Sequence, residues 1–315
     1  MSEQKPEEQL PKKKKKKSNW STWLLLALML IGLAIMAYPT VSDKWNSFHS
    51  SRAILTYDRS VTEAGEAQLQ TMLEEARAYN ASLLEKSNVY RMTDADLEQY
   101  ESLLNISGNG LMGYIRIPSI NVNIPIYHGT DEAILQVAVG HLDWSSLPIG
   151  GESTHAVLSG HRGLPSARLF TDLDKLTEGD RFTITVLNQT ILYEIDQILI
   201  VEPQDVAELN IIPGGDYCTL VTCTPYGVNT HRILVRGHRI EDEDVYSLEI
   251  SPEAAVLPRY LTIPAVGIPL LFLVLTLVLF DASSRRKRRQ VPTVEELQAQ
   301  LEHEKQRGNA NDDNR

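Results

Sequence analysis

Two cysteines, Cys218 and Cys223, lie five residues apart in one predicted strand and are the first candidates for chemistry. Because side chains alternate between the two faces of a strand, an odd separation places these thiols on opposite faces. We therefore predict that they do not form a disulfide with each other. Cys218 stands among apolar neighbours and is expected to be a small core residue. Cys223 ends the strand, directly before a Thr-Pro-Tyr-Gly turn, so we expect its thiol to be accessible.

A nucleophilic thiol needs a base or a cation nearby, because an unperturbed cysteine has a pKa of about 8.5. His161 follows a predicted strand and is flanked by glycines in Ser159-Gly160-His161-Arg162-Gly163, which leaves its ring accessible. Position alone does not separate His161 from five other histidines, each of which also fits a turn or a core position. These are His128, His141, His155, His231 and His238.

Arg232 can be placed relative to Cys223 by the geometry of a β-hairpin. If the turn pairs Cys223 with Thr230, Arg232 lies two residues further along the partner strand and on the same face as the thiol. A guanidinium there can donate hydrogen bonds to an oxyanion that develops during acyl transfer. The alternative is a solvated strand arginine, and a register shift of one residue would turn the side chain to the other face.

The elements that must position these residues are of two kinds. Residues 62–86 and 94–104 have apolar side chains at three- and four-residue steps, which predicts two helices. Short apolar runs broken by turn residues then predict a mainly β domain that forms a closed or nearly closed barrel. The expected strands are residues 113–117, 122–126, 155–159, 182–187, 191–201, 217–223 and 230–236, with short helices at residues 131–137 and 166–172.

Charge is distributed unevenly along the 315 residues, whose formal net charge is −11. A lysine run precedes an apolar stretch that begins at residue 23, and an arginine cluster follows a second stretch at residues 261–280. A basic run alone is compatible with nucleic-acid binding, but beside an apolar stretch it is typical of the cytoplasmic flank of a transmembrane helix. We therefore expect a cell-membrane protein with both termini in the cytoplasm, lipid as a partner and no nucleic-acid partner.

This topology predicts seven parts. They are a basic tail (1–22), a transmembrane helix or signal anchor (23–41), a helical region (42–110), a β-barrel domain (111–245), a linker (246–260), a second transmembrane helix (261–280) and a charged cytoplasmic tail (281–315). The first apolar stretch is also compatible with a cleaved signal peptide, although no clear Ala-x-Ala site follows it.

The segment from Thr219 to Gly227, Thr-Leu-Val-Thr-Cys-Thr-Pro-Tyr-Gly, closely resembles the signature of class C, or pilus-assembling, sortases. The similarity continues through residues 229–237, which contain Arg232. Upstream, residues 158–163 and 169–176 are similar to the histidine segment of that family, and residues 113–115 and 125–130 to its first strands. The resemblance covers about residues 100–240.

The resemblance implies an eight-stranded sortase barrel and a cysteine transpeptidase that needs neither a metal nor an organic cofactor. Carried onto this chain, Cys223 is the nucleophile toward a Leu-Pro-x-Thr-Gly-like sorting signal, His161 is the general acid and base, and Arg232 stabilises the oxyanion. The lysine amine of a pilin subunit then takes the acyl group from the thioacyl enzyme. Thr222, next to the nucleophile, is a further candidate for contact with the substrate.

Pilus sortases often carry a lid with an Asp-Pro-aromatic motif over the cysteine. The corresponding stretch here is Met92-Thr93-Asp94-Ala95-Asp96-Leu97, in which Asp94 matches but the proline and the aromatic residue are absent. We therefore keep Asp94 as a candidate lid residue and expect that any lid is degenerate or is anchored in another way.

Other functions are compatible with parts of this pattern. A sortase that anchors surface proteins to cell-wall peptide would use the same residues, and a thiol protease would release its product to water. A non-catalytic surface scaffold on the same fold would not need the three side chains. Leu257-Pro258 before the second apolar stretch has the outline of a sorting signal, which would make the chain a substrate, but the Thr-Gly of such a signal is absent.

Overall fold

The computed structural model describes residues 20–86, 88–241, 272, 294–295 and 297–303. The basic tail up to residue 19, the predicted linker at residues 246–260 and, apart from residue 272, the second predicted transmembrane helix lie outside the described residues. The chain divides into two units, Met1–Glu249 and Ile250–Arg315. In the second unit, residues 294–295 and 297–303 are helical. The first unit contains all three predicted catalytic residues.

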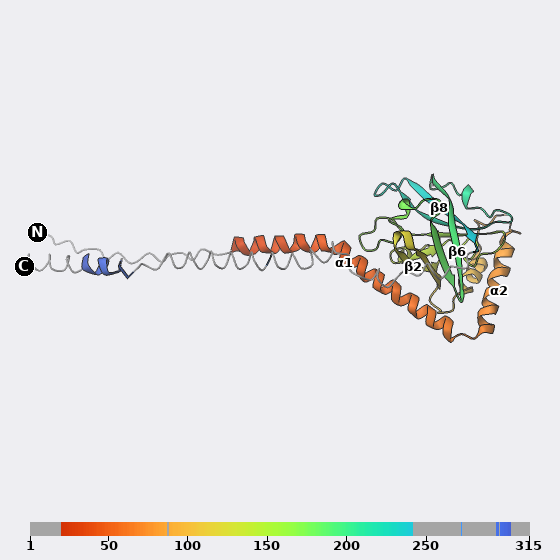
Figure 1. Ribbon diagram of the computed structural model, residues 1–315, viewed down its shortest axis with the longest axis horizontal. Coiled ribbons are helices and arrows are strands. Elements are labelled where there is room, and N and C mark those ends of the chain that lie inside the picture. The colour runs from red at the N-terminus through yellow and green to blue at the C-terminus, as the bar shows by residue number, and fades with distance from the viewer. Residues whose placement is uncertain (1–19, 87, 242–271, 273–293, 296, 304–315) are drawn as a thin grey trace, which may run out of the picture. The chain divides into compact units, whose positions relative to one another are not determined.

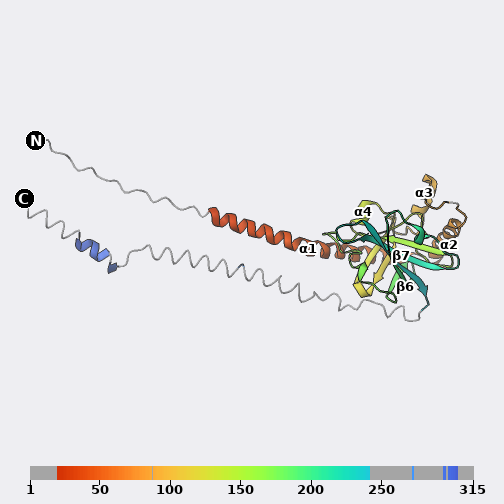
Figure 2. The same cartoon turned by 90° about the horizontal axis from the view of Figure 1, so that it is seen from above.

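Eight strands close into a barrel in the order β1-β2-β3-β4-β7-β8-β6-β5, seen from two directions in Figure 1 and Figure 2. Their bounds are β1 Leu111–Ile117, β2 Val122–His128, β3 Val139–His141, β4 Thr154–Ser159, β5 Arg181–Val186, β6 Gln189–Val201, β7 Asp216–Thr224 and β8 His231–Ile240. The predicted barrel is confirmed. Only β3 was not predicted, because three residues are too few to show a period-two pattern.

Two of the barrel's strand pairs are parallel, β2 with β3 and β4 with β7. A parallel pair needs a long crossover connection, so it joins segments that are distant in the sequence. In the β4–β7 pair, Ser159 lies opposite Val221. The histidine segment and the cysteine segment therefore leave the barrel at the same edge.

The barrel interior is filled by alternate side chains of each strand. On β7, the inward face carries Cys218, Leu220 and Thr222, all buried, and on β8 it carries Ile233 and Val235. The expectation that Cys218 is a core residue is confirmed, and burial raises the pKa of its thiol well above the ordinary value. Both cysteines are free thiols, as their odd separation predicts.

Four α-helices accompany the barrel: α1 Trp20–Glu63, α2 Glu66–Leu83, α3 Asp94–Ser102 and α4 Glu132–Leu135. The helices expected at residues 62–86 and 94–104 correspond to α2 and α3. The helix α1 differs from the expected transmembrane segment because it does not end near residue 41. It continues through Pro39 and onto the barrel.

The helix expected at residues 166–172 is absent, and this prediction was wrong. The segment consists of turns, followed by a short 3-10 helix, η2, at Leu173–Lys175. Leu169 has a φ of 38°, which a right-handed helix does not allow. The amide of Phe170 donates to the carbonyl of His161 at 3.2 Å. The segment therefore folds back on the predicted catalytic histidine instead of forming a helix.

The second half of α1 packs against β1 and the end of β5. Tyr57 is fully buried, and its hydroxyl donates to the carbonyl of Met112 at 2.7 Å and accepts from the amide of Leu187 at 2.7 Å. Ile54 packs in the same cluster with Tyr114. These contacts fix the end of α1 to the barrel through one buried hydroxyl and a small apolar cluster.

Candidate active site

Cys223 and Arg232 are directly opposite each other in the antiparallel β7–β8 ladder. The register differs from the expected one, in which Thr230 was opposite the cysteine, because β7 continues through Thr224 and the turn lies one position further along the chain, at residues 225–230. Thr224 pairs with His231, and the amides of Val228 and Asn229 both donate to the carbonyl of Pro225. Direct opposition still places the thiol and the guanidinium on one face, the outer face of the barrel.

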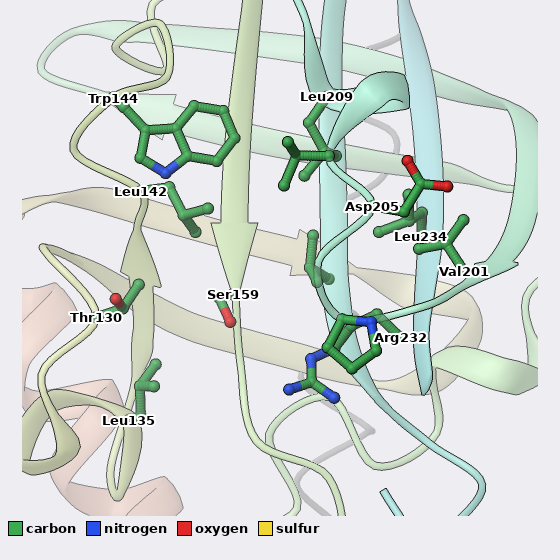
Figure 3. Close-up of a pocket in the computed structure, with 13 residues that line it drawn as sticks. Thr130, Leu135, Leu142, Trp144, Ser159, Val201, Asp205, Leu209, Arg232 and Leu234 are labelled. Carbon is green, nitrogen blue, oxygen red and sulfur yellow. The ribbon is translucent and has the colours of Figure 1, made fainter. Parts of the chain in front are cut away.

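The guanidinium of Arg232 is held at this edge by backbone carbonyls. One of its terminal nitrogens, Nη1, lies 3.0 Å from the carbonyl of His231 and 3.4 Å from that of Asn229. Its side chain also lines a pocket on the outer face of the barrel (Figure 3). A cation in this position can donate to an oxyanion at the neighbouring thiol.

His161 lies at the same edge because β4 and β7 are adjacent. His161 is two positions after Ser159, and Cys223 is two positions after Val221, the partner of Ser159. The parallel register therefore continues toward the pair His161 and Cys223. The amide of Gly160 donates to the carbonyl of Val221 at 3.1 Å, and so the two chains remain together beyond the last ladder pair. The backbone therefore brings His161 beside Cys223.

Thr222 is on the inner face of β7 and is 2% exposed, so its side chain does not face the pocket. Its hydroxyl donates to the carbonyl of Gly160 at 2.7 Å. Gly160 also has no space for a side chain, because a Cβ atom would lie 2.8 Å from the ring of Phe170. Thr222 thus holds the histidine segment in place instead of contacting a substrate.

A second contact between the two segments is made by Arg162, whose side chain is almost entirely buried. It donates to the hydroxyl of Thr224 at 3.1 Å and forms an ion pair with Asp174. Its guanidinium also lies 5.9 Å from the ring centre of Tyr226. Arg162 therefore connects the residue after His161 to the turn after Cys223.

Glu132 is a charged neighbour of His161 that no local pattern in the sequence indicates. Its Oε2 lies 3.6 Å from Nε2 of His161, a nitrogen that is buried and has no hydrogen-bond partner among the described residues. The Gln136 amide donates to the same carboxylate, and this bond, with a smaller contribution from His161, lowers the pKa of Glu132. The carboxylate can therefore contact a positive charge that develops on the imidazole during proton transfer.

The other barrel histidines have structural surroundings that distinguish them from His161. Three are buried, and in each a ring nitrogen is within 2.8 Å of a backbone carbonyl: His128 (Leu103), His141 (Ser146) and His155 (Asn210). Burial lowers the pKa of all three, to about 3 for His141. His231 is exposed and contacts the hydroxyl of Thr230, and His238 lies on β8 near Asp196. His161 is therefore the histidine that the fold places beside Cys223.

The pocket beside these residues has a volume of about 240 Å³ and is mainly apolar. It lies on the outer face of β4, β7 and β8 and is bordered by the connection that follows β6. Figure 3 shows Arg232 and Ser159 toward one end and Trp144 toward the other. The polar residues of its lining are Thr130, Ser159, Asp205 and Arg232, and the remaining nine of the 13 are apolar.

A residue just before the stretch expected to form a lid contacts the pocket lining, and it was not among the predicted site residues. The ring of Tyr90 lies 4.8 Å from that of Trp144, and its hydroxyl donates to the side chain of Asn210 at 2.6 Å. Asp94 is the exposed first residue of α3, which is capped by Thr93 and Asp96. The contact with Trp144 of the pocket lining is therefore made by an aromatic residue four positions before Asp94, outside the predicted lid stretch.

Comparison with known proteins agrees with this architecture. Residues 115–240 match the sortase domain family. The chain is 53% identical to sortase C1 from Streptococcus agalactiae, with 61% of this chain and 100% of that chain covered and a TM-score of 0.60. The chain belongs to the sortase family. The predicted resemblance to class C sortases is thereby confirmed.

Two further relatives support this assignment. Sortase C from Streptococcus pneumoniae is 42% identical to this sortase, with 61% of this chain and 97% of that chain covered and a TM-score of 0.54. Sortase A from Streptococcus agalactiae is 25% identical, and the aligned region covers 70% of this chain and 84% of that protein. Sortases are cysteine transpeptidases, and this sortase is accordingly an enzyme of that kind.

Proposed function

We propose that this sortase cleaves a Leu-Pro-x-Thr-Gly-like sorting signal with Cys223 and transfers the acyl product to a lysine amine of a pilin subunit, polymerising surface pili. The observation that carries the proposal is the direct opposition of Cys223 and Arg232, because the Arg232 side chain also lines the apolar pocket. His161 is at the end of the adjacent strand and supplies the acid and base.

In the first step, the thiolate of Cys223 attacks the threonine carbonyl, and Arg232 donates hydrogen bonds to the resulting oxyanion. The bond from that carbonyl carbon to the glycine nitrogen then breaks. The protonated His161 gives its proton to the departing amine, which leaves a thioester on Cys223.

In the second step, a lysine amine attacks the thioester carbonyl and loses its proton to His161. The tetrahedral intermediate again places its negative oxygen near Arg232. Collapse of this intermediate breaks the carbon–sulfur bond and restores the thiolate and the imidazolium. The product is an isopeptide bond between two subunits, and both catalytic groups return to their initial protonation states.

The pocket supports an apolar signal because most of its lining is aliphatic or aromatic. Burial of a leucine side chain there contributes about 1.5–3 kcal/mol, enough to orient a short peptide but too little to hold it tightly. The guanidinium at the end of the pocket defines where the carbonyl to be attacked must lie. We infer that the Leu-Pro portion occupies the apolar part and that the scissile bond reaches Cys223.

A role in pilus assembly, as opposed to attachment to the cell wall, is supported by the sortases that this chain resembles. A 44% identical sortase C1 is described as that of GBS pilus island 1, and the Streptococcus pneumoniae sortase C was described in connection with pilin substrate specificity. Anchoring in the membrane is supported by the apolar, exposed first half of α1. The two-span topology with cytoplasmic termini remains part of this proposal.

Mass spectrometry of the full chain with a Leu-Pro-x-Thr-Gly peptide tests the proposed nucleophile. We expect an acyl adduct on Cys223 that is lost in Cys223→Ala and kept in Cys218→Ala. Addition of a pilin domain with its lysine should then give an isopeptide product faster than a cell-wall peptide amine gives its product. An adduct on Cys218 would overturn the assignment, and release of the acyl group only to water would indicate a thiol protease.

A further inference from the structure

The helix α1 has two halves with different surroundings. Apolar side chains in its first half are open to solvent, with Trp23 71% and Met36 80% exposed, whereas Tyr57 in its second half is fully buried. The first half is long and apolar enough to cross a bilayer. The apolar sequence ends around Val41, just after Pro39. One continuous helix therefore joins the segment proposed to span the membrane to the barrel.

The turn of α1 that follows the apolar half is hydrogen bonded to two loops of the barrel. The side chain of Asp43 accepts from the amide of Arg168 at 2.9 Å, and the side chain of Asn46 donates to the carbonyl of Val137 at 3.2 Å. Residues three apart lie on the same face of a helix, so this face is directed toward the barrel. We call residues 43–46 the juxtamembrane turn.

Both loops belong to the candidate active site. The loop with Arg168 is the histidine segment, which is closed by the hydrogen bond from Phe170 to the carbonyl of His161. The loop with Val137 follows α4, whose first residue, Glu132, contacts His161. The helix α4 ends at Leu135, so the carbonyl that Asn46 contacts lies two residues beyond the short helix that begins at Glu132. The juxtamembrane turn thus holds the two segments on either side of the His161–Glu132 pair.

The helical rise places this turn close to the bilayer surface. Asp43 and Asn46 are about 3 Å and 7.5 Å beyond Val41 along the helix axis. The headgroup region of one leaflet is about 5–8 Å thick. Two aromatic residues of the same stretch, Trp45 and Phe48, are 68% and 60% exposed. Large aromatic side chains are enriched at the interface of lipid and water.

We propose that the juxtamembrane turn holds the Cys223–His161 edge of the barrel at the level of the lipid headgroups. The edge then acts on sorting signals whose cleavage site lies within a few residues of the substrate's own membrane span. This inference rests on the proposed function, because it concerns how the same site receives its substrate. Its partner is the membrane surface, and its substrate class is a membrane-embedded signal with a short spacer.

An enzyme whose barrel is held further from the bilayer, called the lifted enzyme, tests this proposal. Insertion of eleven helix-forming residues between Val41 and Ser42 adds about three helical turns, preserves the rotational phase and raises the barrel by about 16 Å. The same number of polar residues is added within residues 246–260, so that the second predicted span does not restrain the barrel. Full-length native and lifted enzymes are then compared in phosphatidylcholine–phosphatidylglycerol vesicles.

Three substrates are compared: a soluble Leu-Pro-x-Thr-Gly peptide, the same signal directly before an apolar span, and that signal with a ten-residue spacer. We expect the insertion to slow acylation of Cys223 by the short-spacer substrate by about tenfold or more. A tether that cannot reach the site gives a negligible effective concentration. The ten-residue spacer extends up to about 33 Å and should restore the rate. The soluble peptide should react equally with both enzymes.

Equal rates of native and lifted enzymes on the short-spacer substrate would overturn the proposal. If the soluble peptide does not acylate Cys223 of the native enzyme, the proposed function itself is overturned. If the lifted enzyme is inactive on every substrate, the height of the native barrel is measured directly. A fluorophore on Arg168→Cys, in the full chain with both native cysteines replaced by alanine, reports on the reactive edge.

The matched position is Glu152→Cys, two residues before β4 begins, and the length of β4 from Thr154 to Ser159 separates it from that edge by about 17 Å. Spin-labelled lipid headgroups should quench the fluorophore at position 168 and leave the one at position 152 largely unaffected. Equal quenching at the two positions would overturn the proposal independently of any activity.

Discussion

The hydroxyl of Thr222 donates to the carbonyl of Gly160 at 2.7 Å, which joins the residue before Cys223 to the residue before His161. The two residues are 62 positions apart in the sequence. Because the bond is buried between adjacent parallel strands, the spacing of the thiol and the imidazole depends on it. The relative position of the proposed nucleophile and base is therefore set from inside the barrel.

Thr222→Val is expected to reduce both stability and acylation. Valine has nearly the same shape but leaves the buried carbonyl without its donor, at a cost of about 1–3 kcal/mol. We expect urea unfolding to show this loss and single-turnover acylation to slow by about tenfold through misplacement of His161. Thr222→Ser keeps the hydroxyl and should retain most of the rate. If the free energy of unfolding of Thr222→Val equals that of the native enzyme, this role is contradicted.

Arg232→Ala is expected to lower the acylation rate by about 10²–10³, as does removal of an oxyanion donor in other acyl-transfer enzymes. Arg232→Lys should recover little of the rate, because an ammonium cannot reproduce the planar fork of a guanidinium. Stopped-flow acylation of Cys223 measures both variants.

The control is Arg239→Lys on the same strand, where the side chain pairs with Asp216 near the start of β7. This variant should acylate at the native rate. If Arg232→Ala folds normally and Cys223 is acylated at the wild-type rate, another group stabilises the oxyanion.

Glu132→Gln is expected to slow acylation several-fold at neutral pH, because it removes the negative charge that lies 3.6 Å from a ring nitrogen of His161 while that ring transfers its proton to the leaving amine. The lowered pKa of Glu132 keeps its carboxylate ionised at neutral pH. The two enzymes should therefore differ at neutral pH and converge in acid, where Glu132 is protonated. Because the carboxylate is 71% exposed, 1 M salt should reduce the difference between the two enzymes.

The neighbouring acid provides a control for the charge itself. Asp131→Asn removes the same charge from the same loop at the residue before α4. It should leave the acylation rate at neutral pH unchanged. An identical loss of rate in both variants would mean that the net charge of the loop, and not the contact with His161, is responsible.

Acidification is expected to destabilise the barrel through His141. Its folded-state pKa of about 3 lies below the ordinary value of 6.5, so the unfolded chain binds a proton first as the pH falls. Stability from this group is complete above pH 6.5 and is lost by about 1.4 kcal/mol per pH unit between 6.5 and 3. Urea unfolding at several pH values measures this slope.

His141→Asn should give a shallower slope, while His49→Gln on the exposed side of α1 should not change it. Stability that does not depend on pH below 6.5 would contradict the assigned protonation. His128 and His155 have pKa values lowered in the same direction, so they are expected to maintain part of the slope in the variant.

The sequence by itself determined the types of residues and most of the local elements. The odd spacing of Cys218 and Cys223 separated a core thiol from an accessible one, and period-two patterns located seven of the eight strands. The motifs around Cys223, His161 and Arg232 also indicated the sortase family. Each of these signals depends on neighbours within a few residues, which is the range over which strand periodicity and turn chemistry operate.

Only the tertiary structure decided how these elements meet. The register that places Cys223 opposite Arg232 depended on where the turn begins, and the contact of Glu132 with His161 joins two separate loops. The continuity of α1 onto the barrel and the folding back of the segment near Leu169 were likewise not predicted. These features arise from closure of the barrel, in which parallel pairing of β4 with β7 brings together residues about 60 positions apart. No local pattern encodes such a pairing, because its free energy comes from the shared core and not from either strand alone.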